Sequence, residues 1–61
     1  MGEIKDKNGN VINIGDTICV GNGDVQLETE IEGFTTTNGG TELMVKTRYG
    51  DINVTLVEKC A

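Results

Sequence analysis

The stretch that decides the fold is Val25-Gln26-Leu27-Glu28-Thr29-Glu30-Ile31-Glu32. Its odd positions are apolar or β-branched, and its even positions are polar or acidic. Successive side chains of a β-strand point to opposite faces of the sheet, so this period of two predicts a half-buried strand. No stretch of the chain repeats apolar residues at intervals of three and four. We therefore expect no substantial helix.

Two further strands are predicted beside this one. The segment of residues 14–20 predicts a bend at Gly15-Asp16 followed by the preceding strand, which ends in a loop over residues 21–24. Residues 43–49 form the following strand. Its expected inward side chains are Leu43, Val45, Thr47 and Tyr49.

Charge sets the predicted register between residues 25–32 and 43–49. The acidic side chains Glu28, Glu30 and Glu32 and the basic side chains Lys46 and Arg48 all occupy even positions. If a three-residue loop near Asn38-Gly39 joins the two strands, acidic side chains of one strand therefore face basic side chains of the other. The two registers that this allows place Glu28 or Glu30 opposite Arg48, and Glu30 or Glu32 opposite Lys46. In both, we predict that Glu30 lies on the same face as Lys46 and Arg48.

The next turn is predicted at Gly50-Asp51, as a two-residue hairpin loop with positive φ at Gly50. This loop places Tyr49 opposite Ile52. The inward residues after the loop are then expected to be Ile52, Val54 and Leu56. A tight turn over residues 55–57 and a short strand over residues 58–60 complete the predicted order.

The segment Lys7-Asn8-Gly9-Asn10 predicts an N-terminal hairpin, because Asn-Gly supplies the two positive φ angles of a type I′ turn. The spacing Asp6-x-Asn8-x-Asn10 resembles the start of a calcium loop. However, Val11 and Thr17 stand where such a loop has its glycine and its bidentate glutamate. We interpret the segment as a turn.

Composition limits the classes of partner. The 61 residues make one small domain, and nine glycines without a proline indicate many tight turns. The net charge of −5 repels polyphosphate, which disfavours nucleic acid. No apolar run approaches the roughly 20 residues that cross a bilayer, and residues 2–6 lack the apolar region of an export signal. We expect a cytoplasmic protein with no membrane partner.

Few residues could carry catalysis or bind a metal. Histidine is absent, and Cys19 and Cys60 supply half of a tetrahedral metal site. In a reducing compartment these cysteines are expected to be free thiols. Because Cys19 has no histidine base to activate it, we predict no enzymatic activity and no catalytic residue. No metal and no cofactor are predicted either.

The acidic residues are explained without a site. Same-face carboxylates on a strand lie about 6.7 Å apart, too far to share a proton or one ion. The glutamates of residues 28–32 are therefore interpreted as a solvated face. Asp16 and Asp24 are interpreted as turn residues.

By the order of its elements, the segment of residues 14–60 resembles SH3-like barrels of the KOW and Tudor kind. The Gly15-Asp16 pair leads into a strand with alternate aliphatic residues and then into a glycine loop, as in those barrels. Residues 6–12, with the pattern Asp-x-x-Gly-x-x-Ile, resemble free-standing domains from bacterial and phage genomes.

The resemblance implies one all-β domain over residues 1–61, an SH3-like barrel of five to six short antiparallel strands. Residues 1–13 would form an N-terminal hairpin or extension, and residues 14–60 the barrel. It also implies that Cys19 and Cys60 lie in neighbouring antiparallel strands. Our hypothesis is that the working protein is reduced and that folding does not require a bond between them.

The ligands of those families do not carry over, because the chain has no tryptophan and only Phe34 and Tyr49 as aromatics. We expect a non-catalytic protein–protein interaction module or small assembly component, and no residue is assigned to its binding site. One alternative is a nucleic-acid binder whose basic residues are Lys5, Lys7, Lys46 and Arg48. Another is an acidic inhibitor of the phage type that mimics nucleic acid.

Overall fold

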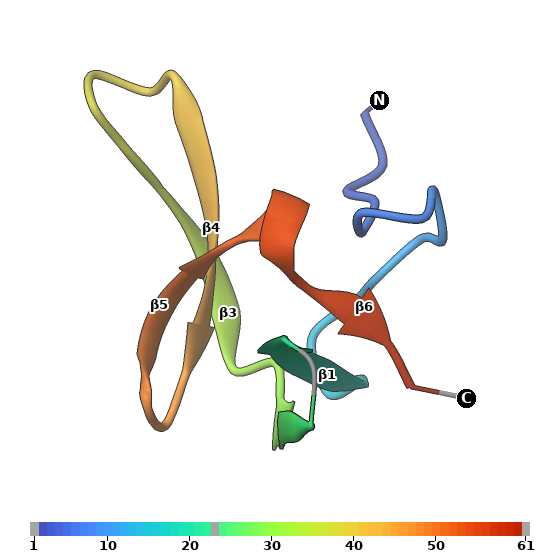
Figure 1. Ribbon diagram of the computed structural model, residues 1–61. Coiled ribbons are helices and arrows are strands. Elements are labelled where there is room, and N and C mark those ends of the chain that lie inside the picture. The colour runs from blue at the N-terminus through green and yellow to red at the C-terminus, as the bar shows by residue number, and fades with distance from the viewer. Residues whose placement is uncertain (1, 23, 61) are drawn as a thin grey trace.

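The computed structural model describes residues 2–22 and 24–60. Six short strands form two open, three-stranded antiparallel sheets, with strand orders β2-β1-β6 and β3-β4-β5 (Figure 1). The elements are β1 (Thr17–Asn22), β2 (Val25–Glu30), β3 (Gly33–Thr37), β4 (Glu42–Thr47), β5 (Gly50–Asn53), the 3-10 helix η1 (Val54–Leu56) and β6 (Glu58–Lys59). The prediction of a small all-β fold with short antiparallel strands is confirmed.

β1 and β2 form a tight hairpin, in which Cys19 faces Glu28. β1 extends to Asn22, so the predicted loop over residues 21–24 is too long at its N-terminal end. Gly21 pairs with Gln26, and a Cβ atom at Gly21 would collide with the carbonyl oxygen of Val25. The glycine therefore permits close strand pairing. Gly23 lies outside the described residues.

The chain changes sheet between β2 and β3, and this overturns the predicted register. The partner of β4 is β3, with Phe34 opposite Val45, whereas Glu30 of β2 faces Thr17 in the other sheet. The side chains that point toward the core belong to odd-numbered residues in β2, such as Thr29, and to an even-numbered residue, Phe34, in β3. The corner between the two strands therefore shifts the alternation by one residue. Both predicted registers between residues 25–32 and 43–49 are therefore wrong.

The loop between β3 and β4 has four residues, Asn38–Thr41, instead of the predicted three. Asn38 has a φ of 54°, and Gly39 and Gly40 also have positive φ. The N–H groups of Gly40 and Thr41 both donate to the carbonyl oxygen of Thr37 at 3.1 Å. The loop is thus closed by its own backbone.

The turn between β4 and β5 lies two residues earlier in the chain than predicted. Thr47 faces Gly50, so the two-residue loop is Arg48–Tyr49, and Gly50 begins β5. The positive φ predicted for Gly50 is confirmed, at 119°. Tyr49 is 60% exposed and Leu56 59% exposed, so both predictions of inward side chains are wrong. Odd-numbered residues of β4 face even-numbered residues of β5, as predicted. However, Ile52 faces Val45 and not Tyr49.

The N-terminal hairpin forms as predicted, with Lys5 opposite Val11, although its turn is of a different type. The N–H of Asp6 donates to the carbonyl oxygen of Asn10, which leaves a three-residue loop. Gly9 has a φ of 85°, but Asn8 is not among the described residues with positive φ. The structure is a three-residue loop with glycine in the left-handed position, and the predicted type I′ turn is wrong.

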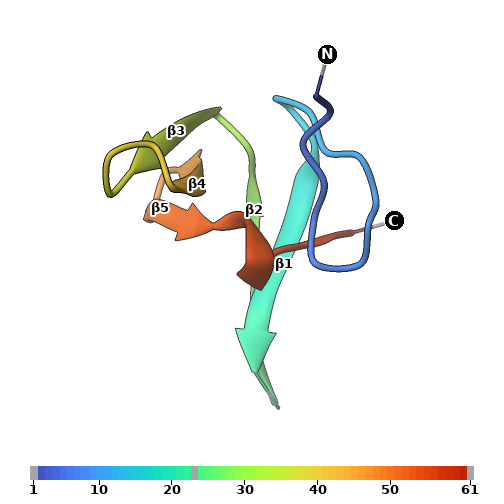
Figure 2. The same cartoon turned by 90° about the horizontal axis from the view of Figure 1, so that it is seen from above.

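The hairpin packs beside β6 at the edge of its sheet (Figure 2). The N–H of Lys7 donates to the carbonyl oxygen of Val57 at 3.1 Å. Ile12 is 2% exposed and joins a core whose other members come from both sheets and their connections. The fully buried core side chains are Ile12, Ile18, Ile31, Val45 and Val57. One cluster thus holds the hairpin and the two sheets together.

Among the described residues, no helix has the length and apolar character that crossing a membrane would require.

Candidate functional site

An acidic groove lies between β2 and the turn that joins β4 to β5. We use this name for the surface hollow of about 480 Å³ that is lined by Glu28, Thr29, Glu30, Glu32, Arg48 and Tyr49. The two sides of the groove come from different sheets. The N–H of Glu32 donates to the carbonyl oxygen of Lys46 at 2.8 Å, which fixes the sheet-changing corner against β4.

The β4–β5 side of the acidic groove is held by a buried threonine. The hydroxyl of Thr47, 8% exposed, donates to the carbonyl oxygen of Gly50 at 2.8 Å and accepts from the N–H of Tyr49 at 3.1 Å. These bonds close the Arg48–Tyr49 turn from inside. As a result, the aromatic ring of Tyr49 is exposed on a turn that is already ordered.

The charge of the acidic groove is negative. Three glutamates line it against one guanidinium, that of Arg48, which lies 5.7 Å from the centroid of the Tyr49 ring. Within the described part of the chain, the carboxylates of Glu28, Glu30 and Glu32 accept no hydrogen bond and form no ion pair. All three are exposed, so they remain available to a cationic ligand.

Thr29 lies between two of these glutamates in β2, and its side chain is buried, with 7% exposed. Its hydroxyl has no hydrogen-bond partner among the described residues. A buried hydroxyl without a partner costs about 1–3 kcal/mol, so such atoms are rare in folded proteins. Thr29 lines the acidic groove, while its unsatisfied hydroxyl is itself buried.

A second hollow of about 470 Å³ lies near η1. Its lining residues are Lys7, Val20, Gly21, Thr55 and Leu56. The exposed Leu56 makes this hollow mainly apolar. It contains a single charged residue and thus offers less to define the chemistry of a ligand than the acidic groove does.

The basic residues of the predicted nucleic-acid binder are divided between two regions. Lys5 and Lys7 belong to the N-terminal hairpin, and Lys46 and Arg48 to the β4 region on the other side of the molecule (Figures 1 and 2). Lys46 faces Asp51 across the β4–β5 pair. The structure does not bring these four residues together.

Asp6 organises the N-terminal turn, and no metal is needed to explain it. Its carboxylate accepts from the N–H groups of Asn8 at 2.9 Å, Asn10 at 2.8 Å and Lys59 at 2.7 Å. Burial raises the pKa of Asp6, but these backbone hydrogen bonds outweigh burial, and its pKa is lowered from the ordinary value. The turn interpretation of Asp6-x-Asn8-x-Asn10 fits these contacts.

The other two aspartates also lie in turns. The Asp16 carboxylate accepts from the N–H of Asn13 at 2.8 Å, which closes the bend before β1. It also forms an ion pair with Lys59 at 3.6 Å, the single ion pair found among the described residues. Asp24 is exposed in the turn between β1 and β2.

Cys19 and Cys60 are joined by a disulfide, with their Cα atoms 5.8 Å apart. The prediction of free thiols is therefore wrong for this structure. The implied placement in neighbouring antiparallel strands is confirmed, because β6 pairs with β1 and the N–H of Cys60 donates to the carbonyl oxygen of Thr17. This pairing brings together two residues that are 41 positions apart.

The acidic groove was missed in the sequence because its two sides meet only when the chain changes sheet. The alternating glutamates were visible, but the pairing assumed for them placed Tyr49 in the core. The exposed Tyr49 follows from the turn at Arg48–Tyr49, and the sequence favoured Gly50-Asp51 instead. Comparisons of this chain with protein-family models, with curated proteins and with solved structures find no match.

Proposed function

We propose that this chain is a non-catalytic binding module that takes up a basic segment of another protein in its acidic groove. The observation that carries the proposal is the set of three exposed, unpaired glutamates beside an ordered Tyr49. Lysine or arginine side chains would meet carboxylates there. Their cationic heads could also stack on the aromatic ring, where Arg48 already lies.

We also propose that the fold is an SH3-like barrel. Two features support this assignment. The first is that the chain passes from β2, in one three-stranded sheet, directly to β3, in the other. The second is that a single 3-10 turn, η1, precedes a last strand that pairs with the first. Such barrels are used for many unrelated ligands, so the function is argued from the acidic groove and not from the fold.

The cytoplasm is the compartment that we propose. The disulfide of the structure is the oxidised form. In the cytoplasm, glutathione and thioredoxin would reduce an accessible disulfide of this kind, so we propose that Cys19 and Cys60 are thiols there. Isolation of the protein from its host with a thiol-alkylating reagent present throughout would test this. Alkylated Cys19 and Cys60 are expected in the mass spectrum, and an intact, unalkylated pair would contradict the proposed compartment.

Binding of a short blocked peptide of alternating arginine and glycine tests the proposed function. We expect the peptide to bind, and we expect the same peptide with glutamate in place of arginine not to bind. Glu30→Gln and Glu32→Gln should each weaken binding by about threefold or more, since each removes one carboxylate from a partly desolvated pair. Added salt should weaken binding further.

Glu3→Gln is the matched control, because it removes the same charge from an exposed residue of the N-terminal segment. An equal loss in Glu3→Gln would show that net charge alone attracts the peptide, and it would overturn the groove assignment. Tighter binding of RNA or DNA than of the basic peptide at low salt would also overturn it.

A further inference from the structure

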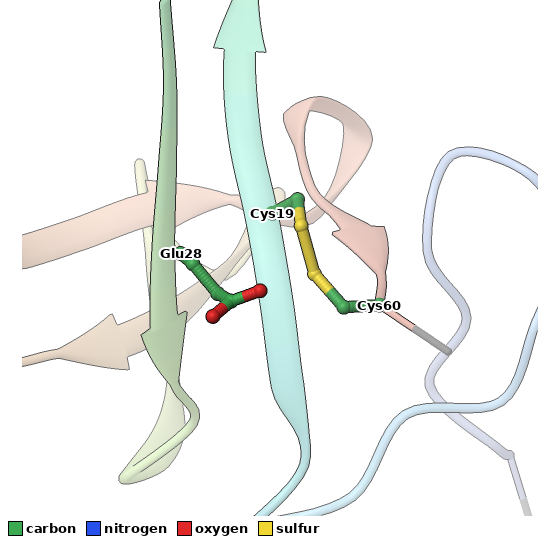
Figure 3. A group of neighbouring side chains, drawn as sticks. All are labelled: Cys19, Glu28 and Cys60. Atoms are coloured by element: carbon green, nitrogen blue, oxygen red, sulfur yellow. A yellow bond between two sulfur atoms is a disulfide. The ribbon is translucent and has the colours of Figure 1, made fainter.

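Cys19, Glu28 and Cys60 lie side by side on one face of the β2-β1-β6 sheet (Figure 3). Glu28 is the direct cross-strand partner of Cys19, and Cys60 follows the short strand β6 on the other side of β1. The two sulfur atoms and one carboxylate oxygen all lie within 4.8 Å of one another. Three residues far apart in the sequence thus present three ligand atoms at one place.

Reduction of the disulfide changes the chemistry of this group. Two molecules of a small thiol break the S–S bond in turn, give up one hydrogen each and are left joined by a disulfide of their own, and the protein gains two thiol groups. If these thiols lose their protons, two thiolates and the carboxylate of Glu28 crowd together, and like charges repel. A cation held among them removes that repulsion.

We propose that the reduced protein binds one zinc ion through the sulfur atoms of Cys19 and Cys60 and the carboxylate of Glu28. Zinc favours four ligands, and thiolate with carboxylate is a donor set that it accepts. The thiolates select a soft or borderline ion over magnesium and calcium. The zinc displaces both thiol protons, which pass to solvent.

The site has room for this ion and for a fourth ligand. Tetrahedral zinc–thiolate bonds place two sulfur atoms roughly 3.7 Å apart. Cα atoms at 5.8 Å allow this separation by side-chain rotation alone. Both cysteines are half-buried and Glu28 is exposed, so water can complete the coordination. This inference rests on the cysteine pair. Glu28 also lines the acidic groove, but the peptide proposal is tested at Glu30 and Glu32, so the two proposals can fail separately.

Cobalt is the spectroscopic probe for the test. The full chain is reduced, freed of reductant under argon and titrated with Co²⁺. We expect sulfur-to-cobalt charge-transfer absorption that saturates at one ion per chain and disappears when Zn²⁺ is added. The oxidised protein should show no such absorption, and Cys19→Ser should lose it. Absence of the absorption in the reduced wild-type chain would overturn the proposal.

Glu28→Gln tests the third ligand. We expect it to weaken Co²⁺ binding by about tenfold or more, as removal of a group that supports a metal site does. Glu30→Gln is the matched control, because it removes a carboxylate from the same face of β2 two residues away. It should leave the affinity unchanged. Equal affinities in Glu28→Gln and wild type would overturn the site as assigned.

Thermal unfolding gives a second measurement that needs no cysteine variant. Zn²⁺ should raise the melting temperature of the reduced chain, because the ion binds the folded form preferentially. It should leave the melting temperature of the oxidised chain unchanged. If the reduced chain is unfolded and Zn²⁺ does not restore its β-sheet circular dichroism, the proposal is wrong.

Discussion

The sequence contains three Asn-Gly dipeptides, and two of them, Asn8-Gly9 and Asn38-Gly39, lie wholly within the described residues, in turns that are built differently. In the N-terminal hairpin, Gly9 has a φ of 85° and the preceding Asn8 is not left-handed. In the loop between β3 and β4, Asn38 and Gly39 have φ angles of 54° and 69°. The same two residues therefore mark a reversal of the chain without fixing its geometry.

The difference comes from what the neighbouring residues bind. Asp6, two residues before Asn8, holds the first turn from inside and also accepts the N–H of Lys59. The second loop makes local bonds: the amide of Asn38 donates to Glu42 and the hydroxyl of Thr41 donates to the carbonyl oxygen of Asn38. The first turn is thus part of the tertiary structure, and the second closes on itself.

The largest expected effect is on β6, the strand to which the first turn is bound. Reduction of Cys19–Cys60 in the presence of a chelator should lower the free energy of unfolding by about 4 kcal/mol, because the bond closes a loop of 41 residues' separation. We expect a folded but less stable domain. Urea unfolding with and without reductant measures the change, and an unchanged midpoint would contradict it.

The next effect measures how far the first turn depends on Asp6. Asp6→Ala should destabilise the protein by on the order of 3 kcal/mol, because it leaves three partly buried backbone N–H groups without their charged acceptor. Asp16→Ala is the control, since that carboxylate accepts one backbone N–H, from Asn13, at an exposed bend. It should cost about 1 kcal/mol. Equal losses in urea unfolding would refute the central role given to Asp6.

The pH dependence of stability follows from the lowered pKa of Asp6. A carboxyl group with a lower pKa in the folded state contributes its stability above the unfolded value of 3.8. That contribution is lost as the pH falls through the folded value. We expect the unfolding free energy to decrease from about pH 5 downward. Asp6→Asn should remove this part of the decrease, and an identical pH profile would exclude Asp6 as its source.

The smallest effects distinguish the two asparagines. Asn38→Ala should cost about 1 kcal/mol, because alanine tolerates the left-handed conformation less well than asparagine. Asn8→Ala loses the exposed bond of its amide to Glu58, at 2.8 Å, and should cost about 0.5 kcal/mol. A larger loss at Asn8 than at Asn38 in thermal unfolding would reverse the comparison.

Local features of the fold could be predicted from the sequence, because turn residues and alternation act over a few positions. The strands around Ile18 and Leu27, the bend at Gly15-Asp16 and the positive φ of Gly50 are of this kind. The sheet change after Glu30 was not predictable from alternation, because Ile31 continues the same period into the corner. Its position depends on remote partners, such as the carbonyl oxygen of Lys46.

The acidic groove and the cysteine pair were hidden for the same reason. Charge matching indicated that the glutamates and Arg48 belong near each other, and the groove contains both. It gave the wrong strand partner, because surface ion pairs contribute too little free energy to select a register. The bond between Cys19 and Cys60 depends on the compartment as well as on geometry, and the choice of free thiols relied on the compartment alone.

The bond from Lys59 to Asp6 has a consequence for synthesis on the ribosome. The two residues are 53 positions apart, so the carboxylate of Asp6 meets its backbone donor only after Lys59 has been translated. Until then, the nascent hairpin lacks its partner strand, and Ile12 lacks the part of its core that Val57 supplies. The β3-β4-β5 meander needs no residue beyond Asn53 for its own pairing. During translation, therefore, the hairpin of residues 5–11 is made before the β3-β4-β5 meander but completes its contacts after the meander can pair.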